Sequence, residues 1–382
     1  GIHSLARAEN KSENWQVVGW IGSLGAFFIL TFYIVISAWV LAFIPQAFGG
    51  TFNGFAAEAA RLTAETGTTV SIADVSASNF GETISNKYVI GGLLASFLLT
   101  NVFVVARGVK GGIEKAATVL MPAFFILLIG IGGFALVEGD AGAAADFLLT
   151  PDFSEVTMGT FLEAVGQAFF SLSVGSCLMI TYGAYLSRDT NIPRASAIVA
   201  SADTMVALIA GFAIFPIVFA FGADPAGGPG LFFVSMPIAF SQMGALGVWV
   251  GGAFFLLALF AAFTSSISLM EVGVAWLEER EGVTRPGAAM GIGFMLFMIG
   301  MGYVYSTDFI DFADIITGNI MLPLCALLLA VFAGWIVSRE MLTTELGEGT
   351  IMNLWRFMCR WIVPPALAFI LVLGTLTKLG VI

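Results

Sequence analysis

The chain has 382 residues, of which 58% are hydrophobic and only 11% are charged. A soluble domain has about 25% charged residues, so this composition excludes an ordinary cytosolic enzyme, a disordered chain and a disulfide-rich secreted domain. The formal net charge of −11 tells less than the positions of the charges, because those positions set the topology of a membrane protein.

Long apolar runs predict an all-α polytopic membrane protein. In lipid only helices and closed barrels satisfy the backbone hydrogen bonds, and these runs are much longer than barrel strands of about ten residues. A spanning helix needs about 20 mostly apolar residues. By that measure we expect about nine spanning helices, over 16–47, 87–106, 117–137, 160–186, 194–221, 245–277, 287–305, 309–337 and 354–380.

Two segments lie outside these spans. Residues 1–14 are polar, so we expect a loop there and no cleavable signal peptide. Residues 224–244 combine a Gly- and Pro-rich turn with a short, interrupted apolar stretch, which predicts a loop that dips into or lies on the protein.

The basic residues predict the orientation of the chain. Across the expected connections, all of the Lys and Arg residues except Arg61, Lys87 and Lys378 fall on one side. By the positive-inside rule this side is cytoplasmic. We therefore expect a multi-pass protein of the inner or plasma membrane, with the N-terminus of this chain cytoplasmic and its C-terminus outside.

Asp203 is the clearest ionisable residue inside an expected span. It lies about ten residues into the fifth span, in the apolar context ASADTMVAL, with no basic residue near it in the sequence. A carboxylate in lipid is costly unless it is paired or functional. Its position is compatible with a coordinated cation, a proton relay or a structural hydrogen bond between helices.

Small hydroxyl residues gather in two other spans. Ser171, Ser173 and Ser176 lie in the middle of the fourth span, where they indicate either close helix packing or a break in the helix. Thr264 and Ser265 in the sixth span are typical of hydroxyls that bond back to the preceding turn. Alternatively, oxygen atoms without thiolate or imidazole neighbours suit a hard monovalent cation.

Other polar groups carry weaker signals. The Tyr33 hydroxyl needs a partner or a ligand at mid-membrane. Asp308, Asp311 and Asp314 recur at helical spacing, as in a solvated acidic first turn or as gate carboxylates. The three cysteines lack metal-ligand spacing and the one histidine lies in the polar N-terminal stretch, so no histidine-based catalysis or metal site is expected.

Several motifs together resemble the neurotransmitter:sodium symporter family, most closely its prokaryotic members. The motifs are FYIVISAW in the first span, GQAFFSLSVGS with ITYGAYL in the fourth, GPGLFFVSMPIAFSQM before the sixth, TSSIS in the sixth, and WRFMCRWIVPP at the last. Their order and spacing agree with the family nearly from end to end of the chain.

The resemblance implies a transporter fold of two inverted repeats with broken helices and binding sites at the midplane. The chain opens in what resembles the loop after the family's second helix, and no NxxGxGNxWRFP-like first helix occurs in it. We therefore expect one transmembrane domain over 1–382 with an incomplete first repeat. Its parts are the cytoplasmic loop 1–14, the rest of the first repeat at 16–137, the second repeat at 160–337 and the last helix at 354–380.

The resemblance also implies roles for individual residues. Two sodium sites are expected, one from Ser171 and Asp203, the other from the Ala261 carbonyl with Thr264 and Ser265. No chloride requirement is expected, because the fixed charge of Asp203 would replace the anion. Substrate binding is implied for Tyr33, Ile29, Phe170, Ser173, Ser176, Ser266 and Leu269, and gating for Phe170, Asp311 and Glu279.

We therefore expect sodium-coupled symport of an amino acid, neutral and hydrophobic or aromatic, by alternating access. No enzyme activity is expected. The partners would be the substrate and the lipid bilayer but no nucleic acid. The sequence leaves open whether the chain forms a homodimer. Without the first two helices of the family, the chain alone is expected to be inactive. The alternatives are a non-transporting membrane receptor or accessory subunit, and a proton-coupled amino-acid carrier.

Overall fold

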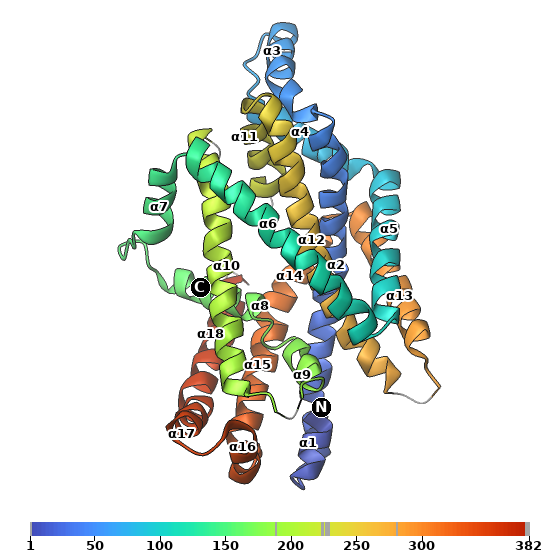
Figure 1. The fold of residues 1–382 in the computed structure, drawn as a ribbon, viewed down its shortest axis with the longest axis vertical. Helices are drawn as coiled ribbons and strands as arrows, with labels where there is room; N and C mark the ends of the chain where they lie inside the picture. Colours follow the sequence, from blue (N-terminus) through green and yellow to red (C-terminus); the bar gives the residue numbers. More distant parts are fainter. Residues whose placement is uncertain (1, 188, 223–224, 226–229, 280–281, 379–382) are drawn as a thin grey trace.

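The protein is helical throughout the part that its structure describes (Figure 1). This computed structural model describes residues 2–187, 189–222, 225, 230–279 and 282–378, and no β-strand occurs among them. Eight helical segments are long and apolar enough to cross a membrane: Glu13–Phe48, Lys87–Ala106, Val109–Glu138, Ile192–Ala220, Ala245–Glu278, Arg285–Tyr305, Phe309–Ile336 and Thr350–Leu376. The predicted all-α membrane fold is confirmed, and these segments match eight of the nine expected spans.

The helices of the first half of the chain follow one another with short connections. They are α1 (Ile2–Ala8), η1 (Glu13–Trp15), α2 (Gln16–Phe48), η2 (Thr51–Gly54), α3 (Phe55–Thr66), α4 (Ile72–Ser85), α5 (Lys87–Ala106), η3 (Val109–Ile113), α6 (Glu114–Glu138), α7 (Ala141–Leu149), α8 (Met158–Ser171), α9 (Leu178–Gly183) and α10 (Ile192–Ala220).

In the second half several long helices contain π-helical turns. The elements are η4 (Leu231–Ser235), α11 (Met236–Gln242), α12 (Ala245–Glu278), α13 (Arg285–Tyr305), α14 (Asp308–Ile315), η5 (Ile316–Met321), α15 (Leu322–Val331), η6 (Phe332–Ile336), α16 (Arg339–Leu346), α17 (Thr350–Phe357), η7 (Met358–Ile362) and α18 (Val363–Lys378).

Helices α2 and α12 form the centre of the molecule. They pack against each other more extensively than any other pair, with α5 and α13 beside them. Helix α6 crosses this pair obliquely and packs against α10 (Figure 1). Both central helices are apolar over most of their length, as expected for helices enclosed by other helices.

Aromatic side chains pack at the end of the molecule that carries α3, α4 and α11. The rings of Phe80 and Phe233 stack with centroids 5.2 Å apart, and Phe43 meets Phe233 edge-on at the same distance. Phe233 and Phe240 are buried. The prediction of a loop at 224–244 is therefore wrong for residues 231–242, which form η4 and α11 because their phenylalanines reach the core; residues 224 and 226–229 lie outside the described residues.

The span predicted over 160–186 is not one helix. Helix α8 ends at Ser171 and α9 begins at Leu178, while Ser173, Gly175 and Cys177 have φ angles of 53°, 92° and 58°. A Cβ atom on Gly175 would lie 2.4 Å from the Leu322 carbonyl oxygen, so only glycine fits this approach to α15. Of the two readings that the small residues allowed, the structure has the helix break.

Candidate substrate and sodium site

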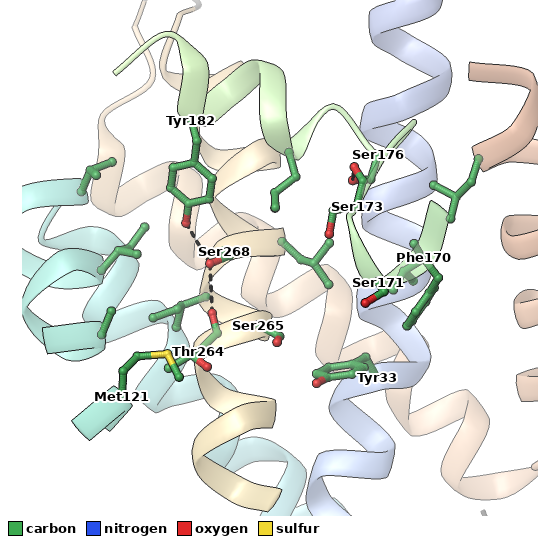
Figure 2. A pocket seen from close by; sticks show the side chains of 18 of the residues that line it. Tyr33, Met121, Phe170, Ser171, Ser173, Ser176, Tyr182, Thr264, Ser265 and Ser268 are labelled. Carbon is green, nitrogen blue, oxygen red and sulfur yellow. Dashed lines mark hydrogen bonds between the residues drawn. The ribbon is translucent and has the colours of Figure 1, made fainter. Parts of the chain in front are cut away.

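The broken helix borders a cavity of about 740 Å³. Figure 2 shows the unwound segment, with Ser173 and Ser176, in front of α2, and α12 beside them, with Thr264, Ser265 and Ser268. The wall combines apolar side chains with hydroxyl groups, as binding sites for small amphiphilic molecules do. It comprises Ile29, Tyr33, Val109, Ile113, Glu114, Ala117, Met121, Gln167, Phe170, Ser171, Ser173, Ser176, Leu178, Tyr182, Thr264, Ser265, Ile267, Ser268, Leu269 and Leu322.

Helix α12 presents an oxygen pair to the cavity. The Thr264 hydroxyl donates to the carbonyls of Phe260 and Ala261 at 3.0 and 3.1 Å, so its oxygen lone pairs remain available. Ser265 follows it in the cavity wall and lies beside the Tyr33 hydroxyl. Thr264 and the Ala261 carbonyl therefore share one face of the helix, as their spacing predicts.

Ser171 and Asp203 meet across two helices. The Ser171 hydroxyl, at the end of α8, donates to Asp203 Oδ1 of α10 at 2.6 Å. Ser171 lines the cavity, whereas Asp203 is partly buried behind it. In the part of the chain that the structure describes, no basic residue forms an ion pair with Asp203. A carboxylate with only a hydroxyl for a partner has oxygen lone pairs left for a cation.

Most residues expected to contact substrate surround the same cavity. Ile29 and Tyr33 of α2, Phe170 of α8 and Leu269 of α12 all line it. Ser173 and Ser176 of the unwound segment do so too, and the Ser176 hydroxyl donates to the Ser173 carbonyl at 2.9 Å. The left-handed backbone at Ser173 departs from the helical pattern. Its N–H donates to the Phe170 carbonyl at 3.1 Å, and its carbonyl, which accepts from Ser176, keeps a second lone pair for a ligand.

Ser266 differs from the other expected substrate residues. It is fully buried and does not line the cavity. Its hydroxyl donates to Oδ1 of Asn101 in α5 at 2.7 Å, and the Asn101 amide donates in turn to the Phe97 carbonyl at 2.9 Å. Ser266 follows Ser265 directly in α12, so its side chain points about 100° away from that of Ser265. The structure therefore gives Ser266 a contact between α12 and α5 in place of the expected contact with the cavity.

Among the cavity residues that were not anticipated from the sequence, Tyr182 and Ser268 form a chain of hydrogen bonds. The Tyr182 hydroxyl of α9 donates to Ser268 at 2.8 Å, and the Ser268 hydroxyl donates to the Thr264 carbonyl at 3.0 Å (Figure 2). This chain of hydrogen bonds joins the second half of the broken helix to the oxygen-bearing turn of α12. Ser268 lies one turn after Thr264, a spacing that could have signalled the link, whereas Tyr182 is distant in sequence.

Of the three expected gate residues, Asp311 and Glu279 lie away from the main cavity and Phe170 lines it. Asp311 is exposed on α14 and forms no ion pair within the described ranges. Glu279 follows α12 and lines a second cavity, of about 420 Å³, together with Trp20, Cys177 and Tyr185. Phe170 is 39% exposed at the wall of the main cavity, so its ring can move without disturbing a packed core.

A buried ion pair lies at the same end of α12. Glu271 is fully buried and forms an ion pair with Arg285 of α13. The Tyr185 hydroxyl donates to Glu271 at 3.0 Å, and Arg285 also donates to Glu278 at 2.8 Å and to the Val105 carbonyl at 3.0 Å. Helices α5, α12 and α13 and the end of α9 are thus connected through one carboxylate and one guanidinium.

Known proteins match the chain over nearly its whole length. The family model described as the sodium:neurotransmitter symporter family matches residues 6–380. An uncharacterized sodium-dependent transporter of Bacillus subtilis is 33% identical over 372 residues, which are 93% of this chain and 79% of that protein. One from Haemophilus influenzae is also 33% identical, over 95% of this chain and 80% of its own length.

Two further comparisons concern amino acids. The sodium-dependent nutrient amino acid transporter 1 of Drosophila ananassae is 29% identical over 223 residues, which are 56% of this chain and 34% of that transporter. The crystal structure of MhsT in complex with L-phenylalanine matches with a TM-score of 0.78 and 34% identity, covering 94% of this chain and 81% of MhsT.

Proposed function

The chain belongs to the sodium:neurotransmitter symporter family, and we propose that it couples sodium entry to the uptake of a neutral, hydrophobic or aromatic amino acid. The observation that carries this proposal is the cavity of about 740 Å³ at which Tyr33, the unwound backbone near Ser173 and the Thr264–Ser265 pair meet. Its matched structural neighbour was crystallised with L-phenylalanine, which supports a substrate of that class.

Two sodium sites form part of the proposal. Ser171 and Asp203 would contribute to the first, and the Ala261 carbonyl with Thr264 and Ser265 to the second. Hydroxyl, carbonyl and carboxylate oxygens favour a hard cation over a transition metal. Since Asp203 brings a negative charge of its own, transport would need no chloride.

The substrate would lie between the unwound segment and α2. Tyr33 would donate to its carboxylate, the unwound backbone at Ser173 would accept from its amino group, and Phe170 would cover it. Ile29, Ser176 and Leu269 would surround its side chain, whereas Ser266 is left out because its hydroxyl is already bonded to Asn101. Sodium and the substrate carboxylate offset each other's desolvation, and this couples their binding.

The remaining parts of the mechanism are also proposals. Asp311 and Glu279 would act at opposite gates, and the arginine-rich end that carries α1, α16 and α17 would face the cytoplasm. The chain spans about four fifths of the length of its matched relatives. That this chain alone is inactive, and that it pairs as a homodimer, stay predictions.

Uptake into proteoliposomes tests the proposal. A chain extended upstream by the two helices that the family resemblance implies should accumulate radiolabelled phenylalanine or leucine under an inward sodium gradient, but not under a potassium gradient. The 382-residue chain should not accumulate either amino acid under the sodium gradient. Sodium-driven uptake by the short chain would refute its predicted inactivity, whereas absence of uptake of any neutral amino acid by the extended chain would refute symport.

Tyr33→Phe should weaken substrate binding. Removing the hydroxyl leaves a buried carboxylate oxygen without a donor, which costs about 1–3 kcal/mol, or roughly a five- to 150-fold loss of affinity. Competition binding of the amino acid at saturating sodium measures this loss. Tyr303→Phe is the matched control, because that hydroxyl lies 3.2 Å from Thr31 and does not line the cavity. Equal affinities of the parent chain, Tyr33→Phe and Tyr303→Phe would show that Tyr33 does not belong to the substrate site.

Asp203→Asn separates sodium coupling from proton coupling. In a sodium site the amide keeps one coordinating oxygen, so the sodium requirement should rise while uptake survives at high sodium. In a proton carrier the substitution removes the titrating group, so uptake driven by a pH gradient should vanish. The assay compares the two gradients in vesicles of the extended chain. Loss of all uptake at every sodium concentration would favour the proton-coupled alternative.

A further inference from the structure

Three arginines converge at the end of the molecule that carries α16 and α17. Asn353, Arg356 and Arg360 follow one another at i, i+3 and i+7 along the continuous helix α17–η7, so they share one face. Arg339, at the start of α16, donates to Asn353 at 3.3 Å and so joins that face. Arg360 is anchored on the Gly334 carbonyl at 2.5 Å.

The positive charge of this cluster is uncompensated within the described residues. None of the three arginines forms an ion pair there, although Glu340, Glu345 and Glu348 lie in the same stretch of chain. The positive charges of Arg360 and Arg339 both lie close enough to act on Arg356. Its Nε atom is buried and has no hydrogen-bond partner. A buried donor without a partner is costly, so an acceptor that reaches this guanidinium would relieve an unfavourable arrangement.

Apolar side chains flank the cluster on the same helix. A second stripe of exposed side chains runs beside the arginine face. It consists of Ile351, Leu354, Met358 and Trp361. Trp361 meets Trp335 edge-on with ring centroids 5.9 Å apart. Exposed tryptophans mark the depth of the lipid headgroups in membrane proteins. The guanidinium groups therefore lie where a headgroup phosphate and the upper acyl chains of one lipid would be found together.

We infer that Arg339, Arg356 and Arg360 form a binding site for the phosphate of an anionic phospholipid. Guanidinium groups suit this ligand because they bind phosphate oxygens in pairs, which a lysine ammonium does not. A lipid held here would connect α16, η6 and the start of the last spanning segment. This inference is independent of the proposed transport, because none of the three arginines lines the substrate cavity.

Lipid retention measured by native mass spectrometry tests the site. The purified chain in a neutral detergent is titrated with dioleoylphosphatidylglycerol, and in parallel with dioleoylphosphatidylcholine and with inorganic phosphate. We expect saturable retention of one phosphatidylglycerol, and at least a tenfold rise in its apparent Kd in Arg356→Gln and in Arg339→Gln. Arg339 is exposed, so its replacement should leave the fold intact.

Lys110→Gln is the control for general attraction of anionic lipid, because Lys110 is an exposed cation of η3, between α5 and α6, without an ion pair in the described structure. The apparent Kd of Lys110→Gln for phosphatidylglycerol should equal that of the parent chain. Three outcomes would overturn the inference: equal retention of phosphatidylcholine, an equal loss in Lys110→Gln, or displacement of the lipid by millimolar inorganic phosphate, which would make this a site for soluble phosphate.

Discussion

Replacing both Thr264 and Ser265 by Ala should raise the sodium concentration for half-maximal binding at least tenfold. The double substitution removes two hydroxyl oxygens that α12 presents to the cavity and leaves the Ala261 carbonyl in place. An interaction with a charged group contributes about 1.5–3 kcal/mol, and 1.4 kcal/mol corresponds to a factor of ten in an equilibrium constant. Sodium titration of the melting temperature at constant ionic strength measures the shift.

Ser96→Ala with Thr100→Ala provides the matched control. These α5 hydroxyls lie one turn apart and, like that of Thr264, donate to backbone carbonyls, at 2.8 and 2.9 Å, but they do not line the main cavity. Their loss should leave the sodium response unchanged. An unchanged titration in the Thr264 and Ser265 variant, with the melting temperature itself intact, would remove the pair from the sodium site.

Arg285→Met should destabilise the fold by about 3–5 kcal/mol. The Glu271 side chain is 0% exposed and the Arg285 side chain 14% exposed, so removing the guanidinium leaves a buried carboxylate without its counter-ion. Within the described residues, Tyr185 alone then remains as a donor, at 3.0 Å. Unfolding in mixed detergent micelles should show the loss as the largest among the single substitutions proposed here.

Two further variants identify the cause of that loss. Adding Glu271→Leu to Arg285→Met removes both charges and should recover most of the stability, because a buried ion pair contributes little beyond what apolar residues supply. Arg7→Met breaks an ion pair with Glu13 whose side chains are 70% and 55% exposed, and should cost less than 1 kcal/mol. A double variant no more stable than Arg285→Met would show that packing of the arginine stem, not charge, is lost.

The membrane fold could be predicted from apolar run length, because lipid imposes one structure on such runs. The break at 172–177 could not be predicted from composition, since small residues serve close packing as well as unwinding. Ser173 and Cys177 have positive φ angles on either side of Gly175, which lies so close to α15 that a Cβ on it would clash with Leu322. Such a contact between distant parts of the chain leaves no local signal.

The polar site could be predicted in part. Buried hydroxyls and Asp203 stood out because they are costly in lipid, and the structure brings Ser171 to Asp203 at 2.6 Å. Which face of α12 each hydroxyl occupies was less evident, since Ser265 lines the cavity while Ser266 contacts Asn101. Pairing partners in other helices, such as Asn101, depend on helix packing that a single sequence does not specify.

Cation selectivity of the purified protein tests the central claim most directly. The claim is that Ser171 with Asp203 at one site, and Thr264 with Ser265 at the other, supply oxygens that replace the water around sodium ions. Melting temperatures are compared in NaCl and KCl at equal ionic strength, with and without phenylalanine. We expect a saturable rise with sodium that phenylalanine increases, and none with potassium. An equal response to both salts, or a response to sodium that survives Asp203→Ala together with Thr264→Ala, would contradict the claim.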